Sequence, residues 1–126
     1  MHARSRRIVF VIDSDEAMRV THETILRNEG YEIMSAPDGA RALPLLREQA
    51  PELVLVSAKI GSLSAIQLIR VMRADTSLRN AKVVVYGRPE DNVREAARKA
   101  GAHGYLELPV SPQRLVREVL VLIGRA

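Results

Sequence analysis

Small polar and acidic residues follow apolar segments of the sequence at points where they could do chemistry. Asp13 and Ser14 come directly after "RIVFVI", and Ser57 ends the apolar run "LVLVS". An aspartate in such a place can ligate a hard cation, and a serine hydroxyl can act as a nucleophile when a base lies beside it. Which of these two chemistries is available depends on the elements that position the residues.

Apolar residues alternate along the chain between a strand period and a helix period. Each predicted strand is followed by a predicted helix, five times in succession. The strands are expected at 8–12, 31–36, 53–57, 81–87 and 104–108, and the helices at 14–30, 38–50, 65–74, 90–101 and 111–124. Such a pattern, with nearly continuous apolar strands, predicts an α/β fold with a parallel sheet covered by helices on both faces.

Details of three helices are also predicted. In the first helix, Met18, Thr21 and Ile25 should face inward. In the fourth helix, the residues expected to face inward are Val93, Ala96, Ala97 and Ala100. Pro44 lies inside the second helical pattern. Because an interior proline removes a hydrogen bond and clashes with the preceding turn, this helix is expected to be kinked or to begin near Leu43.

In a parallel α/β sheet the functional crevice lies at the carboxyl ends of the strands. Those ends are predicted at Asp13 and Ser14, Ala36, Ser57, Gly87 and Leu108. None of the three histidines is expected near them: His2 and His22 are placed elsewhere, and His103 at the opposite edge of the sheet. Ser57 therefore has no base, and we expect no catalytic residue.

Length and composition limit the classes of protein. A chain of 126 residues is the size of one domain, predicted at 6–126 after a flexible segment at 1–5. No apolar run has the ~20 residues of a membrane span, and the start of the chain lacks a signal-peptide core, so we expect a cytoplasmic protein without membrane insertion. The absence of cysteine excludes disulfides and thiolate sites.

The charge pattern bears on polyanionic partners. The net charge is +4, from 19 basic and 15 acidic side chains that are mostly interleaved. Only "RSRR" at 4–7 forms a basic cluster, and four aromatic residues offer little base stacking. Nucleic acid is therefore not the expected partner.

Five segments, in order, carry a resemblance to a known family: "VIDSDEAMR", "EGYEIMSAPDGARAL", "PELVLVS", "LIRVMRAD" and "KAGAHGYLELPVSPQRL". Residues 6–124 resemble the receiver domain of bacterial response regulators. The resemblance implies a flavodoxin-like sheet in the order 2-1-3-4-5 with five flanking helices. It also implies a place in two-component phosphorelay signalling, where a histidine kinase transfers a phosphoryl group to an aspartate of the receiver.

The positions that carry this chemistry in the family are altered here. The family has two Mg²⁺-binding acids after the first strand, an acceptor aspartate after the third, a hydroxyl after the fourth and a lysine after the fifth. The corresponding residues of this chain are Asp13, Ser14, Ser57, Gly87 and Leu108. The resemblance is thus to a degenerate receiver, or pseudo-receiver, that is not an enzyme. We expect no Mg²⁺, with Asp13 as the only weak candidate ligand.

The family's usual output and dimer face implies a protein partner or a second copy of the chain. It is formed by the fourth helix, the fifth strand and the fifth helix. Tyr105 occupies the position of a family aromatic that moves inward when the residue at the hydroxyl position reorganises around the phosphoryl group. Tyr86 is expected to fill part of the space left by Gly87. The candidate partner residues are Glu90, Arg94, Arg98, Tyr105, Arg117 and Glu118.

The sequence thus predicts a pseudo-receiver that acts by phosphorylation-independent protein–protein interaction. Three alternatives stay open. The altered crevice could bind a small ligand or nucleotide through Lys59, Arg88 and the loop 62–64. A residue other than aspartate could accept the phosphoryl group. Finally, "RSRR" and the excess arginines could bind nucleic acid.

Overall fold

The computed structural model describes residues 7–126 as one parallel sheet between two layers of helices. The strands are β1 (Ile8–Ile12), β2 (Glu32–Ala36), β3 (Leu53–Ser57), β4 (Lys82–Gly87) and β5 (Gly104–Glu107). The helices are α1 (Glu16–Asn28), α2 (Gly39–Gln49), α3 (Ala65–Ala74), α4 (Arg94–Ala100) and α5 (Pro112–Ile123), with a 3₁₀ turn η1 (Pro89–Asp91) before α4. The prediction of a flexible segment at 1–5 lies outside the described residues, as does most of the "RSRR" cluster.

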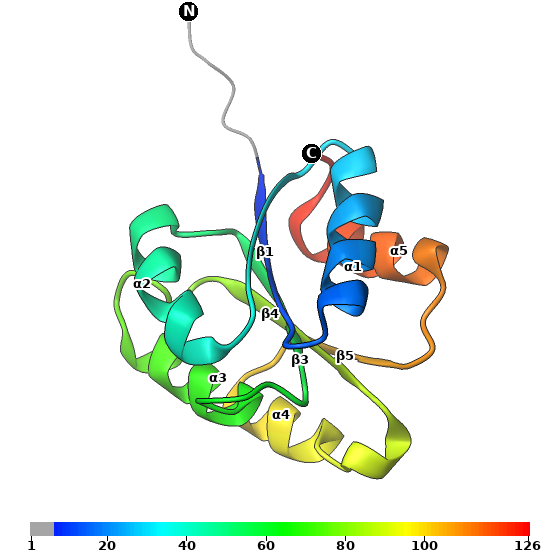
Figure 1. Cartoon of the computed structure of the whole chain (residues 1–126). Helices are drawn as coiled ribbons and strands as arrows, with labels where there is room; N and C mark the ends of the chain where they lie inside the picture. The colour runs from blue at the N-terminus through cyan, green and yellow to red at the C-terminus, as the bar shows by residue number, and fades with distance from the viewer. Residues whose placement is uncertain (1–6) are drawn as a thin grey trace, which may run out of the picture.

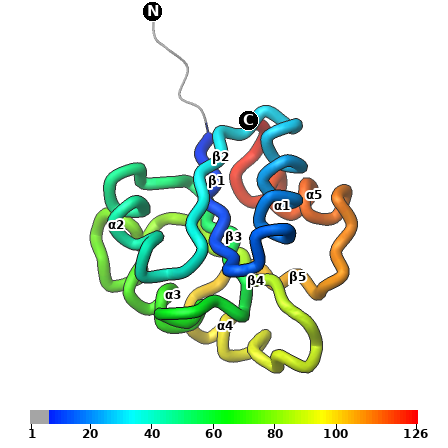
Figure 2. Tube along the Cα trace, viewed as in Figure 1, coloured from blue at the N-terminus to red at the C-terminus, as the bar shows by residue number. Residues whose placement is uncertain are grey.

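The strand order is β2-β1-β3-β4-β5, as the resemblance implied, and every pairing is parallel. Figure 2 shows the strands in this order across the molecule. The register places Ser57 on β3 opposite Tyr86 on β4. Consequently, the ends of β1, β3 and β4 meet at one edge of the sheet.

Each face of the sheet has its own apolar core, because alternate residues of a strand point to opposite faces. α1 and α5 cover one face, and α2, α3 and α4 cover the other (Figure 1). The first core contains Val9, Val11, Leu26, Leu55, Tyr86, Leu115 and Val119, and the second contains Phe10, Ile12, Leu46, Val54, Leu68, Ile69, Met72, Val85 and Ala97. Tyr86 therefore points toward α1 and α5, whereas its neighbours on β4 point toward α3 and α4.

The second helix decides between two alternatives of the sequence prediction. It spans Gly39–Gln49, close to the predicted 38–50, with Pro44 inside it, so the alternative start near Leu43 was wrong. The Asp38 side chain accepts a hydrogen bond of 2.8 Å from the Arg41 amide and so fixes the start of the helix. Pro44 lies on the exposed side, where the loss of one main-chain donor leaves no buried group unpaired.

The first and fourth helices also differ from the prediction. His22 and Leu26 are the buried residues of α1, while Thr21 is exposed. The fourth helix starts only at Arg94, because Asn92 adopts a left-handed conformation (φ 51°) that ends the preceding 3₁₀ turn. In α4 only Ala97 is buried, and Ala96, predicted to face inward, is exposed.

Within residues 7–126, no helix is both long and apolar enough to cross a membrane.

Candidate functional site

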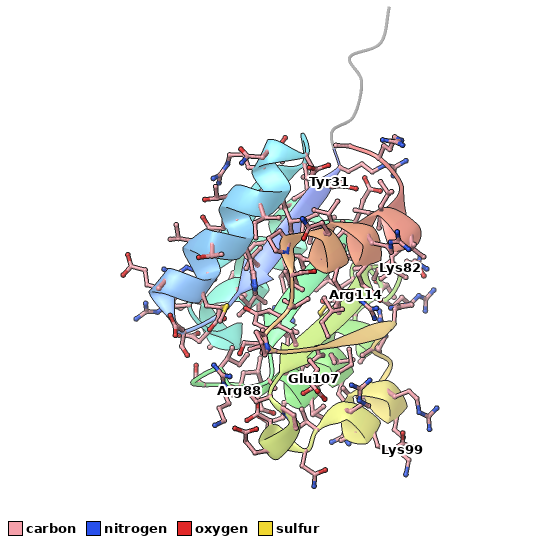
Figure 3. The ribbon with its side chains drawn as sticks, turned by 90° about the vertical axis from the view of Figure 1, so that its right-hand side faces the viewer. Tyr31, Lys82, Arg88, Lys99, Glu107 and Arg114 are labelled. Atoms are coloured by element: carbon pink, nitrogen blue, oxygen red, sulfur yellow. The ribbon has the colours of Figure 1, made fainter. Side chains whose placement is uncertain are left out.

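A cavity of about 220 Å³ lies at the carboxyl ends of β1, β3 and β4. It brings together all five positions that the sequence singled out, together with residues from the following loops. Figure 3 shows Lys82 at the start of β4 and Arg88 just beyond its other end, next to this cavity. The lining residues are Asp13, Ser14, Asp15, Met18, Ser57, Lys59, Gly87, Arg88, Asp91 and Leu108.

Asp13 is buried at the end of β1, with 3% of its surface exposed, and both its carboxylate oxygens accept hydrogen bonds. Oδ1 accepts one of 2.9 Å from the Asp15 amide. Oδ2 accepts one from the phenol of Tyr86. Burial raises the pKa of Tyr86, and the negative charge of Asp13 raises it further, so the phenol stays protonated and donates. The carboxylate is thus held by the protein itself.

His22 lies closer to this site than the sequence analysis expected. Its ring is buried on α1 and meets the ring of Tyr86 edge to face, with 4.7 Å between the centroids. Burial lowers the pKa of His22, and the charge of Asp13 opposes that shift. The prediction that His22 lies away from the strand ends was wrong. Its ring contacts Tyr86 of β4, and the hydroxyl of Tyr86 in turn donates to Asp13 at the end of β1.

Ser57 ends β3 and is buried, with 8% of its surface exposed. Its hydroxyl oxygen accepts a hydrogen bond of 3.2 Å from the Lys59 amide, and it lies 3.4 Å from the Lys59 carbonyl. These contacts close a local turn after the strand. A serine used in this way stabilises the loop, and no base among the described residues contacts its hydroxyl.

Gly87, at the end of β4, lies beneath a carboxylate that the sequence analysis did not include. A Cβ at this position would be 2.7 Å from the Tyr105 hydroxyl, 2.8 Å from Oδ2 of Asp91 and 2.9 Å from Cβ of Ala58. Oδ2 of Asp91 accepts a hydrogen bond of 2.8 Å from the Arg88 amide, and Oδ1 lies 3.3 Å from Nζ of Lys59. The Arg88 hydrogen bond, with help from Lys59, lowers the pKa of Asp91. A negative charge therefore occupies the space next to Gly87.

Leu108 completes the cavity from the end of β5. Its amide donates to the Gly87 carbonyl at 2.8 Å, and its side chain packs against the core under α1 and α5. The peptide bond between Leu108 and Pro109 is cis. The side of the cavity that this residue forms is consequently apolar and offers no cation to an anion.

The predicted partner face is centred on Tyr105, which extends from β5. The guanidinium of Arg94 lies over its ring, 4.7 Å from the centroid, and is 3.7 Å from the carboxylate of Glu107. Two hollows of about 230 and 430 Å³ adjoin this pair and share both residues. Figure 3 shows Glu107 between Arg114 of α5 and Lys99 of α4.

The other candidate residues of that face are more dispersed. Glu90 is exposed on η1, and Arg98 is bonded to Glu95 of its own helix at 2.7 Å. Glu118 lies against Gly104 of β5. Arg117 instead lines a groove of about 490 Å³ between α1 and α5. The structure thus gathers Arg94, Tyr105 and Glu107, and Arg117 belongs to a different surface.

Sequence reasoning missed Asp91 and the position of His22. The signal for Asp91 was weak, because it lies four residues beyond a strand end and its position depends on the 3₁₀ turn. The signal for His22 was its spacing of four residues from both Met18 and Leu26, which places all three on one side of α1. Tyr86 was expected to fill space near Gly87; it points to the opposite face and bonds to Asp13.

The comparisons with known proteins agree with this geometry. Residues 9–120 match the model of the response regulator receiver domain. The chain is 30% identical over 121 residues to the DNA-binding response regulator MtrA of Mycobacterium tuberculosis, across 95% of this chain and 52% of MtrA. It thus spans about half the length of the MtrA proteins that it matches. It is also 24% identical over 119 residues to the polar-differentiation response regulator DivK of Brucella anthropi, across 94% of this chain and 97% of DivK.

Two solved structures show the same fold. Chemotaxis response regulator CheY4 of Vibrio cholerae has a TM-score of 0.86 at 18% identity, covering 94% of this chain and all of CheY4. The receiver domain of the sensor histidine kinase PA1611 of Pseudomonas aeruginosa, solved with a magnesium ion coordinated in its active site cleft, has a TM-score of 0.87 at 21% identity. That match covers 95% of this chain and 99% of PA1611's domain. Because residues 9–120 match that family model and the fold is the same, the chain belongs to the response regulator receiver domains of two-component signalling.

Proposed function

We propose that this receiver domain is a pseudo-receiver, which signals by binding another protein and not by phosphorylation of an aspartate. In this proposal the domain has no enzymatic activity of its own. It takes part in a two-component pathway because a partner protein recognises the conformation of the folded domain. A partner that binds one conformation more tightly than another is sufficient for such a signal.

The observation that carries the proposal is the carboxylate of Asp91 beside Gly87. Phosphoryl transfer depends on positive charge and hydrogen-bond donors around the transferred group. Here an acid that is itself paired with Lys59 occupies this position. The strand end opposite carries Ser57 where the family has its acceptor aspartate, and Leu108 replaces the lysine.

The side chains of the cavity do not fit Mg²⁺. This cation requires near-octahedral oxygen ligands and is usually bound by one or two carboxylates together with water and substrate phosphate. Within residues 7–126, no group of three or more acidic, histidine or cysteine side chains is arranged to hold a metal. Each oxygen of Asp13 already accepts a hydrogen bond from the protein. We therefore include independence from Mg²⁺ in the proposal.

The partner is proposed to bind at the surface around Arg94, Tyr105 and Glu107. An exposed arginine stacked on a tyrosine between two hollows is the kind of pair that contributes strongly to protein interfaces. Arg98 lines one of the two hollows, and Glu118 lies against Gly104 in the same hollow. The occupant of this surface is a protein of the same pathway or a second copy of this chain. The name of MtrA refers to a protein about twice as long, and we assign no DNA contact to this domain.

Two rival functions are less well supported by the geometry. A nucleotide or similar ligand would need a pocket of roughly 300 Å³ or more, whereas the cavity has about 220 Å³. Lys59 is engaged by Asp91, and Ser64 caps α3, so neither is free for an anion. Phosphorylation of Ser57 would require the hydroxyl to leave its contacts with Lys59 and find a base.

The test is an amide NMR titration with Mg²⁺, followed by Mg²⁺ with beryllofluoride, which mimics the phosphoryl group on an aspartate. We expect no saturable shifts at Asp13, Ser57 and Gly87. Intact-mass measurements after incubation with acetyl phosphate should show no added phosphoryl group, with a receiver that keeps its acceptor aspartate as the positive control. Saturable shifts or a stable phosphoryl adduct would contradict the proposal.

The partner surface is tested separately in a strain that lacks the gene. Ser57→Ala should restore the function of the strain, whereas Arg94→Glu and Tyr105→Ala should not, provided that each variant folds and accumulates to the same level. Arg41→Glu is the matched control for Arg94→Glu, because Arg41 is an exposed arginine of α2 on another part of the surface. If Ser57→Ala fails while the surface variants succeed, the assignment of both sites is wrong.

A further inference from the structure

We infer that Tyr86 excludes cations from the cavity, because its phenol occupies the Asp13 carboxylate that a cation would need. The inference deepens the proposed function, and it rests on that proposal for the cation-free state of the natural protein. It adds that restoring an acidic residue at Ser57 is not sufficient to restore a cation site.

The position of Tyr86 follows from its strand. Ser57 and Tyr86 are register partners on β3 and β4, and Gly87 follows on the opposite face. Because side chains alternate, Tyr86 projects into the core beneath α1 and α5, where it is 1% exposed. From there its hydroxyl reaches Asp13 at the end of β1, across the intervening strand β3.

The hydroxyl of Tyr86 donates to Asp13, and the core around its ring is mainly apolar. Its ring packs among the core residues Val84, Leu106 and Leu115, and the ring of His22 meets it edge to face. A cation that displaced the phenol from Oδ2 of Asp13 would remove the hydrogen bond that this buried hydroxyl makes. Leaving a buried donor unsatisfied costs about 1–3 kcal/mol. The phenol cannot serve as an anionic ligand either, since burial and Asp13 raise its pKa.

Tyr86 therefore stabilises Asp13 in place of a cation, because its hydroxyl donates a hydrogen bond to the buried, negatively charged Oδ2. The Asp15 amide satisfies the other oxygen at 2.9 Å. A burial this deep is tolerated because each oxygen has a donor. The arrangement explains how one acid of the family's pair can stay buried here without a metal.

The experiment compares Mn²⁺ binding by four forms of the domain: the natural protein, Ser57→Asp, Ser57→Asp with Tyr86→Phe, and Ser57→Asp with Tyr105→Phe. Binding is followed by paramagnetic broadening of the amide signals of residues 13–15 and 57–59. Tyr105→Phe is the matched control, because it also removes one phenol oxygen near the cavity but leaves Asp13 bonded. We expect the Tyr86→Phe double variant to bind Mn²⁺ at least tenfold more tightly than Ser57→Asp and than the Tyr105→Phe double variant.

The outcomes separate this inference from the proposed function. If Ser57→Asp alone binds as tightly as its Tyr86→Phe double variant, or if neither binds, Tyr86 is not the deciding residue and the inference is wrong. If the natural protein itself binds Mn²⁺ with saturation, the proposed cation-free function fails, whatever the variants do.

A second measurement covers the case in which the Tyr86→Phe double variant does not fold. The buried hydroxyl proton of Tyr86 is followed by NMR in Ser57→Asp while Mg²⁺ is added. We expect its signal to stay unchanged, because the phenol keeps Asp13. A loss or large shift of that signal as Mg²⁺ saturates would show that a cation displaces the phenol and would overturn the inference.

Discussion

Replacing Gly87 by alanine should destabilise the domain, although the same change usually stabilises a chain by restricting its unfolded state. The backbone at Gly87 is not in the left-handed region, so alanine is conformationally allowed there. The obstacle is space. The new methyl group would lie 2.7 Å from the Tyr105 hydroxyl, 2.8 Å from Oδ2 of Asp91 and 2.9 Å from Cβ of Ala58.

All three distances are shorter than an ordinary contact between heavy atoms that are not hydrogen-bonded. Overpacking of this kind costs about 1–3 kcal/mol, against a gain of about 0.4–1 kcal/mol from the more restricted unfolded chain. The net expectation is a loss of about 1–2 kcal/mol in the free energy of unfolding. The Tyr105 ring should also move, because its hydroxyl is the nearest of the three groups and the end of a side chain.

Urea unfolding measures the loss, and the aromatic NMR signals of Tyr105 measure the movement. Gly61→Ala is the control: a Cβ at Gly61 would meet nothing within 4 Å, so this variant should show only the gain of about 0.4–1 kcal/mol from the restricted unfolded chain. Gly87→Ala in a Tyr105→Phe background should lose less, since one of the three contacts is gone. An unchanged or increased stability of Gly87→Ala, with the Tyr105 signals unmoved, would refute the packing around this strand end.

Three further predictions concern stability. Burial lowers the pKa of His22, so unfolding takes up a proton as pH falls below about 6.5; the free energy of unfolding should decrease by at most about 1.4 kcal/mol per pH unit. When the free energy of unfolding is measured by urea melts between about pH 7 and 5, His22→Asn should remove the contribution of His22 to its pH dependence. The contribution of His103, whose pKa burial also lowers, should remain. Arg73 donates to three backbone carbonyls at 2.8 Å, and Arg73→Lys should cost about 1–3 kcal/mol in the same assay. Tyr31→Phe removes a hydrogen bond of 2.6 Å to the Gly124 carbonyl; we expect a loss of about 0.5–1.5 kcal/mol and faster amide exchange after α5.

The architecture was accessible from the sequence because it depends on local patterns. Apolar runs of five or six residues with helical segments between them predict a parallel sheet, and the structure confirms it with the strand order that the resemblance implied. The residues at the strand ends could be read directly, since Ser57 and Gly87 end their strands and Leu108 follows its own. Helix starts were less reliable: Asp38 caps α2 at Gly39, which rules out the alternative start near Leu43, and α4 begins later than predicted because Asn92 turns the backbone.

The contents of the cavity were decided by tertiary structure. Side chains of residues 13, 22 and 86 meet only because β1, β4 and α1 are brought together by a sheet whose strand order differs from the order of the chain. Likewise, the side chain of Asp91 lies beside Gly87 because a 3₁₀ turn brings the chain back, and this turn ends at Asn92 in a left-handed conformation. The sequence by itself determined which residues stand at the strand ends, because the identity of a residue does not depend on the fold. Only the folded chain decided which groups surround them, because hydrogen bonding and packing act between atoms that the sequence places far apart.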